Sequence, residues 1–195
     1  MDAPAAFYFD LASPTAYLAA ERILSLMPGP CPWQPILARL LPDSEGFDAY
    51  RCETDELAAR QAIEARTGEL GLQPLVWPAR FPFDSELALL AATYAKRLGK
   101  CVPFSLAAFR QAFAGGNPLD VEDTVLIAGA ACEMHPRAIL SAITTRGVRA
   151  ELERATAQAL ERGVSDVPAV RIGERVLVGE DRLEEAAALL AASLS

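Results

Sequence analysis

Ser13 and Pro14 follow a short apolar stretch, and this pair is the clearest candidate for chemistry in the chain. At the N-cap of a helix, a serine hydroxyl accepts a backbone N–H, and a proline at the first helical position has no N–H to leave unsatisfied. The start of a helix carries a partial positive charge that stabilises an anion, and the Ser13 hydroxyl can donate to one. Ser13 is therefore either an anion-binding residue or a plain helix cap.

The other side chains that commonly do chemistry give weaker signals. His135 is the single histidine, which excludes mechanisms that need two histidines and argues against most transition-metal sites. Its position directly before Pro136 favours a surface role. We expect no metal site. The four cysteines form no Cys-x-x-Cys pair and are predicted to be reduced, mostly buried thiols: Cys31, Cys52, Cys101 and Cys132.

Composition and charge narrow the class of protein. Apolar residues make up 52% of the 195 residues, which allows a large core, and the formal net charge of -8 argues against nucleic acid or an anionic membrane as partner. No segment reaches the roughly 20 apolar residues that span a bilayer. The first residues lack the basic and apolar stretches of a secretory signal. We therefore predict a cytoplasmic protein that binds neither nucleic acid nor membranes.

The N-terminal part of the chain has an α/β pattern. Residues 7–9 predict a buried strand, and apolar residues with helical spacing follow Pro14 as far as Met27. Residues 33–37 predict a second strand, in which Pro35 indicates an edge position or a bulge.

The C-terminal part returns to the same pattern after a long helical stretch. Between about residues 54 and 146 we predict helices only. They start near Thr54, at Asp84 or Ser85, at Pro103, at Asp120 and at Pro136, and Asp120 with Asp123 resembles a capping box. A helix over 149–162 leads to strands at 169–172 and 175–178, joined by a type II′ turn at Gly173-Glu174. Asp181 can cap a final amphipathic helix. The economical architecture is one sheet built from both chain ends with a helical domain inserted between them.

Four segments, in the same order and at similar spacing, resemble the thioredoxin superfamily. They are Phe7–Ala19, with its strand, Ser-Pro and helix; Pro78–Pro82; Gly163–Pro168, which resembles the segment that precedes the cis-proline; and Gly179–Leu183. The resemblance is to the branch with DsbA-like proteins, kappa-class glutathione transferases and 2-hydroxychromene-2-carboxylate isomerases. It implies an α/β thioredoxin fold, with residues 1–43 and 148–195 forming the thioredoxin-like domain and 44–147 an inserted all-helical domain.

The resemblance implies that glutathione is the cofactor and that Ser13, with Pro14, lies against its sulfur. Redox members of the superfamily have Cys-x-x-Cys where this chain has residues 13–16, so dithiol exchange cannot occur here. The thiolate is the reactive form of a thiol, and the resemblance gives Ser13 the catalytic role of stabilising it.

Four further residues are implied to hold the tripeptide. The backbone of Val167, before a cis Pro168, would pair with glutathione as an added strand does. Glu180 and Asp181 would meet its γ-glutamyl end. From the residues alone, Pro168 also fits an ordinary strand-entry proline, and Asp181 an ordinary helix cap.

An aromatic or conjugated acid substrate could lie against the proline-rich loop. Trp77 and Phe81 would line its pocket and Arg80 would face its carboxylate; alternatively these aromatic residues pack the core and Arg80 is solvated. In the family a lysine and an asparagine commonly follow the second strand, whereas Pro42 and Gly46 align with those places. Arg39 could replace the lost charge.

The first hypothesis for function is a glutathione-dependent isomerase of the 2-hydroxychromene-2-carboxylate type. The second is a kappa-like transferase, which would consume glutathione, and the third is a binding module of the same fold without catalysis. Relatives suggest a homodimer.

Overall fold

The computed structural model describes residues 5–44 and 53–194, with the backbone alone at 53 and 54. A four-stranded sheet has the order β2-β1-β3-β4 and comprises β1 (Ala5–Phe9), β2 (Trp33–Pro35), β3 (Ala169–Ile172) and β4 (Arg175–Val178). β2 runs parallel to β1, and β3 and β4 are antiparallel to their neighbours. Tyr8 lies opposite Ala169, so both chain ends build one sheet, as predicted.

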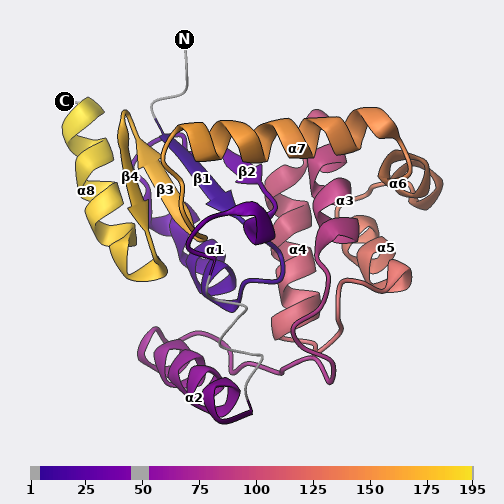
Figure 1. Ribbon diagram of the computed structural model, residues 1–195, viewed down its shortest axis with the longest axis horizontal. Helices are drawn as coiled ribbons and strands as arrows, with labels where there is room; N and C mark the ends of the chain where they lie inside the picture. The colour runs from indigo at the N-terminus through magenta and orange to yellow at the C-terminus, as the bar shows by residue number, and fades with distance from the viewer. Residues whose placement is uncertain (1–4, 45–52, 195) are drawn as a thin grey trace.

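The helices follow the predicted pattern along the chain (Figure 1). Their bounds are α1 (Pro14–Leu26), α2 (Glu53–Glu69), α3 (Glu86–Arg97), α4 (Cys101–Phe113), α5 (Glu122–Ala130), α6 (Pro136–Ile143), α7 (Arg146–Glu161) and α8 (Leu183–Leu194). Short 3-10 turns at Ala38–Leu40 and Glu180–Arg182 flank the sheet. No described helix is both long and apolar enough to cross a membrane.

Alternation along β1 gives the sheet two different faces. Phe7 and Phe9 join the large core formed with α1, α4 and α8. Ala6 and Tyr8 point to the other face, where Ala159 of α7 packs against them. α7 therefore covers one face of the sheet, while α1 and α8 cover the other.

The large core also extends into the helical segment without interruption, from Ala5 in β1 to Ile143 in α6. The predicted boundary at residue 148 lies in the first turn of α7, which begins at Arg146. Between residues 54 and 146, all of which the structure describes, it has helices and no strand, in agreement with the prediction for that segment.

Two predicted helix starts are wrong. α4 begins at Cys101, so Pro103 lies inside the first turn, where a missing N–H costs nothing. α5 begins at Glu122 after Val121, with no side-chain cap, and the predicted capping box at Asp120 does not form. Asp120 instead makes an ion pair with Arg80, 2.8 Å away.

Candidate active site around Ser13

The sheet topology brings three of the predicted site segments to one edge. β1 ends just before the turn to Ser13, and β3, which is antiparallel to it, begins directly after Pro168. The Gly179 N–H donates to the Pro168 carbonyl at 2.8 Å, which holds the turn at Glu180 beside the same edge. Residues far apart in sequence are thus placed together by strand pairing.

Ser13 is the N-cap of α1, as predicted. Its Oγ accepts the Ala16 N–H at 3.1 Å and lies 3.0 Å from Thr15 Oγ1, and Ser13 is only 5% exposed. Either hydroxyl of this pair can be the donor. If Thr15 donates to Ser13, the Ser13 hydroxyl proton is available to a ligand at the positive end of the helix.

Asp10 organises the turn that presents Ser13. This buried carboxylate accepts the N–H of Ala12 and the N–H of Ala38, each at 2.9 Å, so it links the turn after β1 to the loop after β2. Burial raises the pKa of Asp10, and the backbone hydrogen bonds together with one to Ser85 partly oppose the shift. Our sequence analysis missed Asp10, although a carboxylate directly after a buried strand is a recognisable turn signal.

The Val167–Pro168 peptide bond is cis, which confirms the prediction, and Val167 is 5% exposed. The Val167 N–H donates to Asp166 Oδ1 at 2.7 Å, so a bound peptide that pairs with this N–H must displace that carboxylate. In the same segment, the Ser165 carbonyl accepts the Asp43 N–H at 3.0 Å.

Glu180 is buried and its carboxylate is held by two arginines. Arg22 of α1 approaches Oε2 at 2.8 Å, and Arg66 of α2 donates to Oε1 at 2.5 Å. Its side chain is 8% exposed, so the carboxylate ties α1 and α2 to the turn before α8. Neither arginine was predicted, because the pairing joins residues 158 and 114 positions apart.

Asp181 is exposed and lies within the 3-10 turn, so the prediction that it caps the last helix is wrong: α8 begins at Leu183. Its carboxylate folds back over Gly179. A Cβ at Gly179 would clash with Asp181 Oδ1, and φ there is +107°, so this position requires glycine.

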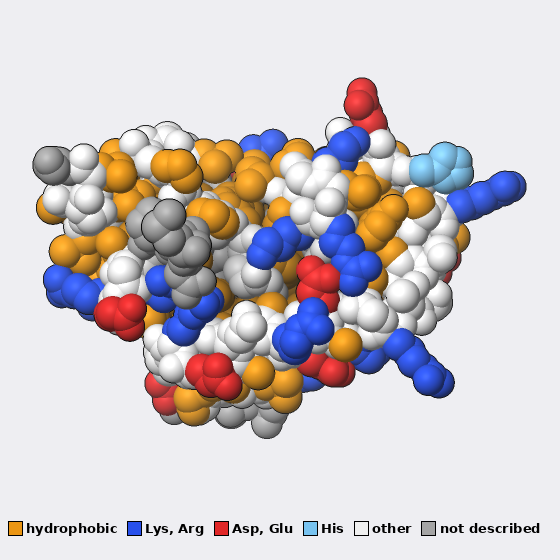
Figure 2. Space-filling view, turned by 90° about the horizontal axis from the view of Figure 1, so that it is seen from above, with side chains coloured by type: hydrophobic (Ala, Val, Ile, Leu, Met, Phe, Trp, Pro, Cys, Tyr) orange, Lys and Arg blue, Asp and Glu red, His pale blue; other side chains and the backbone are white. Residues whose placement is uncertain are grey.

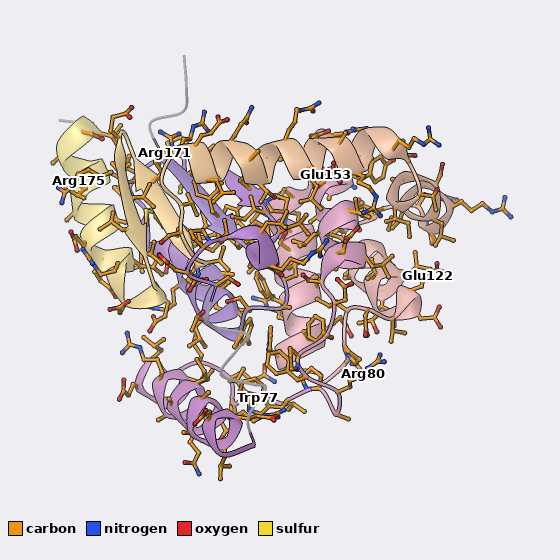
Figure 3. The ribbon with its side chains drawn as sticks, viewed as in Figure 1. Trp77, Arg80, Glu122, Glu153, Arg171 and Arg175 are labelled. Carbon is orange, nitrogen blue, oxygen red and sulfur yellow. The ribbon has the colours of Figure 1, made fainter. Side chains whose placement is uncertain are left out.

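The four predicted substrate residues do not converge. Arg39 makes ion pairs with Glu86 and, at 3.7 Å, with Asp84. Arg80 pairs with Asp120 and lies farther along its loop than Trp77, on the side away from α2 (Figure 3).

Trp77 and Phe81, in contrast, are brought together, with ring centroids 5.2 Å apart in an edge-to-face arrangement. Phe81 is 8% exposed and belongs to the core. Trp77 donates to Glu64 at 2.7 Å, and the Arg60 guanidinium of α2 lies 4.7 Å from the Trp77 ring centroid. Arg60 thus places a cation on this aromatic surface, which sequence analysis did not find.

The cysteines are not placed as nucleophiles in the described part of the chain. Cys31, Cys101 and Cys132 are free, and Cys52 lies outside the described residues, as does Gly46. Burial raises the pKa of Cys31 to about 12 and that of Cys101 to about 11. Among residues 5–44 and 53–194 no cluster of ligating side chains could hold a metal ion. Pro42 is exposed on the loop after β2.

Comparison with solved structures shows the same fold in proteins of different activity. A 2-hydroxychromene-2-carboxylate isomerase is 21% identical, with a TM-score of 0.83 and 98% of each chain covered. A probable DsbA oxidoreductase from Streptomyces coelicolor is 15% identical, with a TM-score of 0.77, over 97% of this chain and 89% of the other. The cytosolic disulfide reductase DsbM from Pseudomonas aeruginosa, solved with GSH, is 16% identical, with a TM-score of 0.60, over 97% of this chain and 98% of the other.

No curated protein sequence matches the chain. The family model of the DSBA-like thioredoxin domain matches residues 6–191, nearly the whole length. With the sheet, the N-cap serine and the cis-proline in place, the chain belongs to the DSBA-like thioredoxin domain family.

Proposed function

We propose that the protein is a glutathione-dependent isomerase of the 2-hydroxychromene-2-carboxylate type. The observation that carries the proposal is the Ser13 hydroxyl at the N-terminus of α1, at the same sheet edge as Pro168, with no cysteine at positions 13–16. A thiol must then be supplied by a cofactor. The fold shared with a 2-hydroxychromene-2-carboxylate isomerase and with a reductase solved with GSH supports glutathione in that role.

Ser13 would act on the sulfur of bound glutathione. A hydroxyl that donates to the thiolate, in the field of the helix N-terminus, lowers the pKa of the thiol and raises its reactive fraction. The thiolate would add to a conjugated carbon of the substrate, the adduct would rotate about the bond that has become single, and elimination would restore the double bond and the thiolate. Glutathione is not consumed.

The substrate in this proposal is an aromatic or conjugated acid. Trp77 offers an aromatic surface. The Arg60 guanidinium lies against it and pairs with Glu56 at 2.6 Å, so an acid substrate would have to compete with that carboxylate for the charge. The protein would act in the cytoplasm, where glutathione keeps thiols reduced, and as a homodimer, which light scattering can measure.

A binding module without catalysis is the second candidate, and Glu180 favours it. Its carboxylate is already held by Arg22 and Arg66, so it is not free to accept the γ-glutamyl ammonium. A kappa-like transferase differs from the isomerase in one measurable way, because it uses up glutathione with turnover.

Calorimetric titration with glutathione tests the proposal, with Ser13→Ala as the variant. We expect the wild type to bind glutathione and Ser13→Ala to bind it nearly as well, because backbone groups hold the tripeptide. The bound thiol should titrate about one to two pKa units higher in Ser13→Ala, since a hydrogen bond to a charged group contributes roughly 1.5–3 kcal/mol. Ultraviolet absorbance of the thiolate reports this pKa.

Ser25→Ala is the matched control, because Ser25 is an exposed serine at the other end of α1. It should leave the thiol pKa unchanged. An unchanged pKa in Ser13→Ala would make Ser13 a helix cap only, and absence of glutathione binding in the wild type would favour a module for another ligand.

A further inference from the structure

A cavity lies on the α7 side of the sheet, at the end of the strands opposite Ser13. Its volume is about 140 Å³, and its lining includes Ala5 and Ala6 from the start of β1. The polar side chains around it come from the sheet, α3 and α7: Tyr8, Gln34, Lys96, Gln158, Arg162 and Arg171. None of Ser13, Pro168 and Glu180 lines it, so this cavity is separate from the candidate active site. In Figure 3, Arg171 lies at the top of the molecule and Trp77 near the bottom.

The charge of this lining is positive, although the whole chain carries -8. Lys96, Arg162 and Arg171 line the cavity, and no carboxylate does. Elsewhere on the same side of the molecule, charged side chains of both signs are spread among apolar and polar ones (Figure 2). The single-sign lining is thus a local feature of the cavity.

Lys96, one of these cations, is held by a neutral group. Lys96 Nζ donates to Gln34 Oε1, and no carboxylate of the described chain lies within ion-pair distance of it. Arg171 is 6% exposed and donates to the Gly173 carbonyl at 2.7 Å. The Gln34 amide oxygen orients the Lys96 ammonium without cancelling its charge, so that charge still acts on the cavity.

The buried hydroxyl of Tyr8 is an independent sign of a ligand site. It is 2% exposed, it lines the cavity, and its buried hydroxyl has no hydrogen-bond partner among the described residues. Buried hydroxyls are nearly always satisfied, because leaving one unpaired is costly. An acceptor placed in the cavity would satisfy this donor.

We propose that the cavity binds a small tetrahedral oxyanion of the phosphate or sulfate class. The lining provides donors from ammonium, guanidinium, amide and phenol groups, which is the set that recognises a multivalent oxyanion. The cavity volume of about 140 Å³ is large enough for one such ion. The site would be independent of the glutathione site at the other end of the sheet.

The experiment titrates the protein with inorganic phosphate by calorimetry, in chloride buffer of matched ionic strength. We expect one phosphate per chain and a phosphate-dependent rise in Tm. Tyr8→Phe and Lys96→Gln should each weaken binding about tenfold or more, since each removes a hydrogen bond to a charged ligand. Sulfate should compete with phosphate, whereas acetate should not.

Lys100→Gln is the matched control, because Lys100 is the chain's other lysine and binds the Cys132 carbonyl, outside the cavity. It should bind phosphate as the wild type does. In phosphate-free buffer, Tyr8→Phe should melt no lower than the wild type, because the hydroxyl removed has no partner. Three results would overturn the proposal. In the first, phosphate binds and raises the Tm no more than chloride does, and in the second, acetate binds as tightly as phosphate. The third is that Lys100→Gln weakens phosphate binding as much as Lys96→Gln does.

Discussion

Arg66 of α2 donates to Glu180 in the turn before α8, across 114 positions of sequence. Glu180 is the more buried partner, with its side chain 8% exposed against 35% for Arg66. Figure 1 shows α2 at the lower edge of the molecule, apart from the other helices. The ion pair therefore connects a peripheral helix to the turn beside the candidate active site.

Glu180→Gln should destabilise the protein markedly. It leaves Arg22, 13% exposed, without its buried carboxylate, and breaking a buried pair by removing one partner costs roughly 3 kcal/mol or more. Urea unfolding measures the loss. Hydrogen exchange should show the largest decrease in protection in α2.

Glu184→Gln is the control for that prediction. Glu184 also pairs with Arg22, but its side chain is 58% exposed, so its loss should cost less than about 1 kcal/mol. If the two substitutions lower the free energy of unfolding equally, then burial of Glu180 does not determine the strength of its ion pair with Arg22.

Asp10→Asn should change how stability depends on pH. Burial raises the folded-state pKa of Asp10 above its ordinary 3.8, so folding favours the protonated form. The contribution of Asp10 is therefore fully present below 3.8 and is lost as pH rises through the folded-state pKa. We expect the free energy of unfolding of the wild type to fall relative to Asp10→Asn over this range, as denaturant titrations at several pH values will show; parallel pH profiles would contradict it.

The local parts of the candidate site could be predicted from sequence, because their signals lie within a few residues. Ser13 with Pro14 is the helix start that the side-chain rules favour, and the resemblance of the segment before Pro168 to the thioredoxin superfamily predicted its cis bond. The sheet from both chain ends followed from the strand patterns at residues 7–9 and 169–178.

Charged residues were predicted less well, because their partners come from distant elements. Asp120 has the local pattern of a helix cap, but Arg80, from the loop between α2 and α3, takes its carboxylate instead. Glu180 fits a ligand-binding turn by sequence, yet two helices supply arginines to it. Periodicity identifies the helices, but it does not say which charged side chains meet across them.

Cys101 should resist alkylation in the folded protein. Burial raises its pKa to about 11, so at pH 8 only about one molecule in a thousand carries the reactive thiolate. Iodoacetamide labelling followed by peptide mapping should leave Cys101 unmodified in the native protein and modify it in urea. Rapid native labelling would contradict its burial at the start of α4, against β2.

Ser13→Cys tests whether the start of α1 stabilises a sulfur anion, which is the property that the proposed function requires. A thiolate there would accept the Ala16 N–H that now donates to Ser13, beside the Thr15 hydroxyl and in the positive field of the helix. We expect the new thiol to have a pKa well below the ordinary 8.5 or so, as cysteines at helix N-termini do.

The control is Ser25→Cys, at the negative end of the same helix, where no such decrease is expected. Because Ser13 is 5% exposed and Ser25 is exposed, the pH at which alkylation reaches half its maximal rate is compared rather than the rate itself. Equal midpoints for the two thiols would remove the physical basis for thiol activation by Ser13.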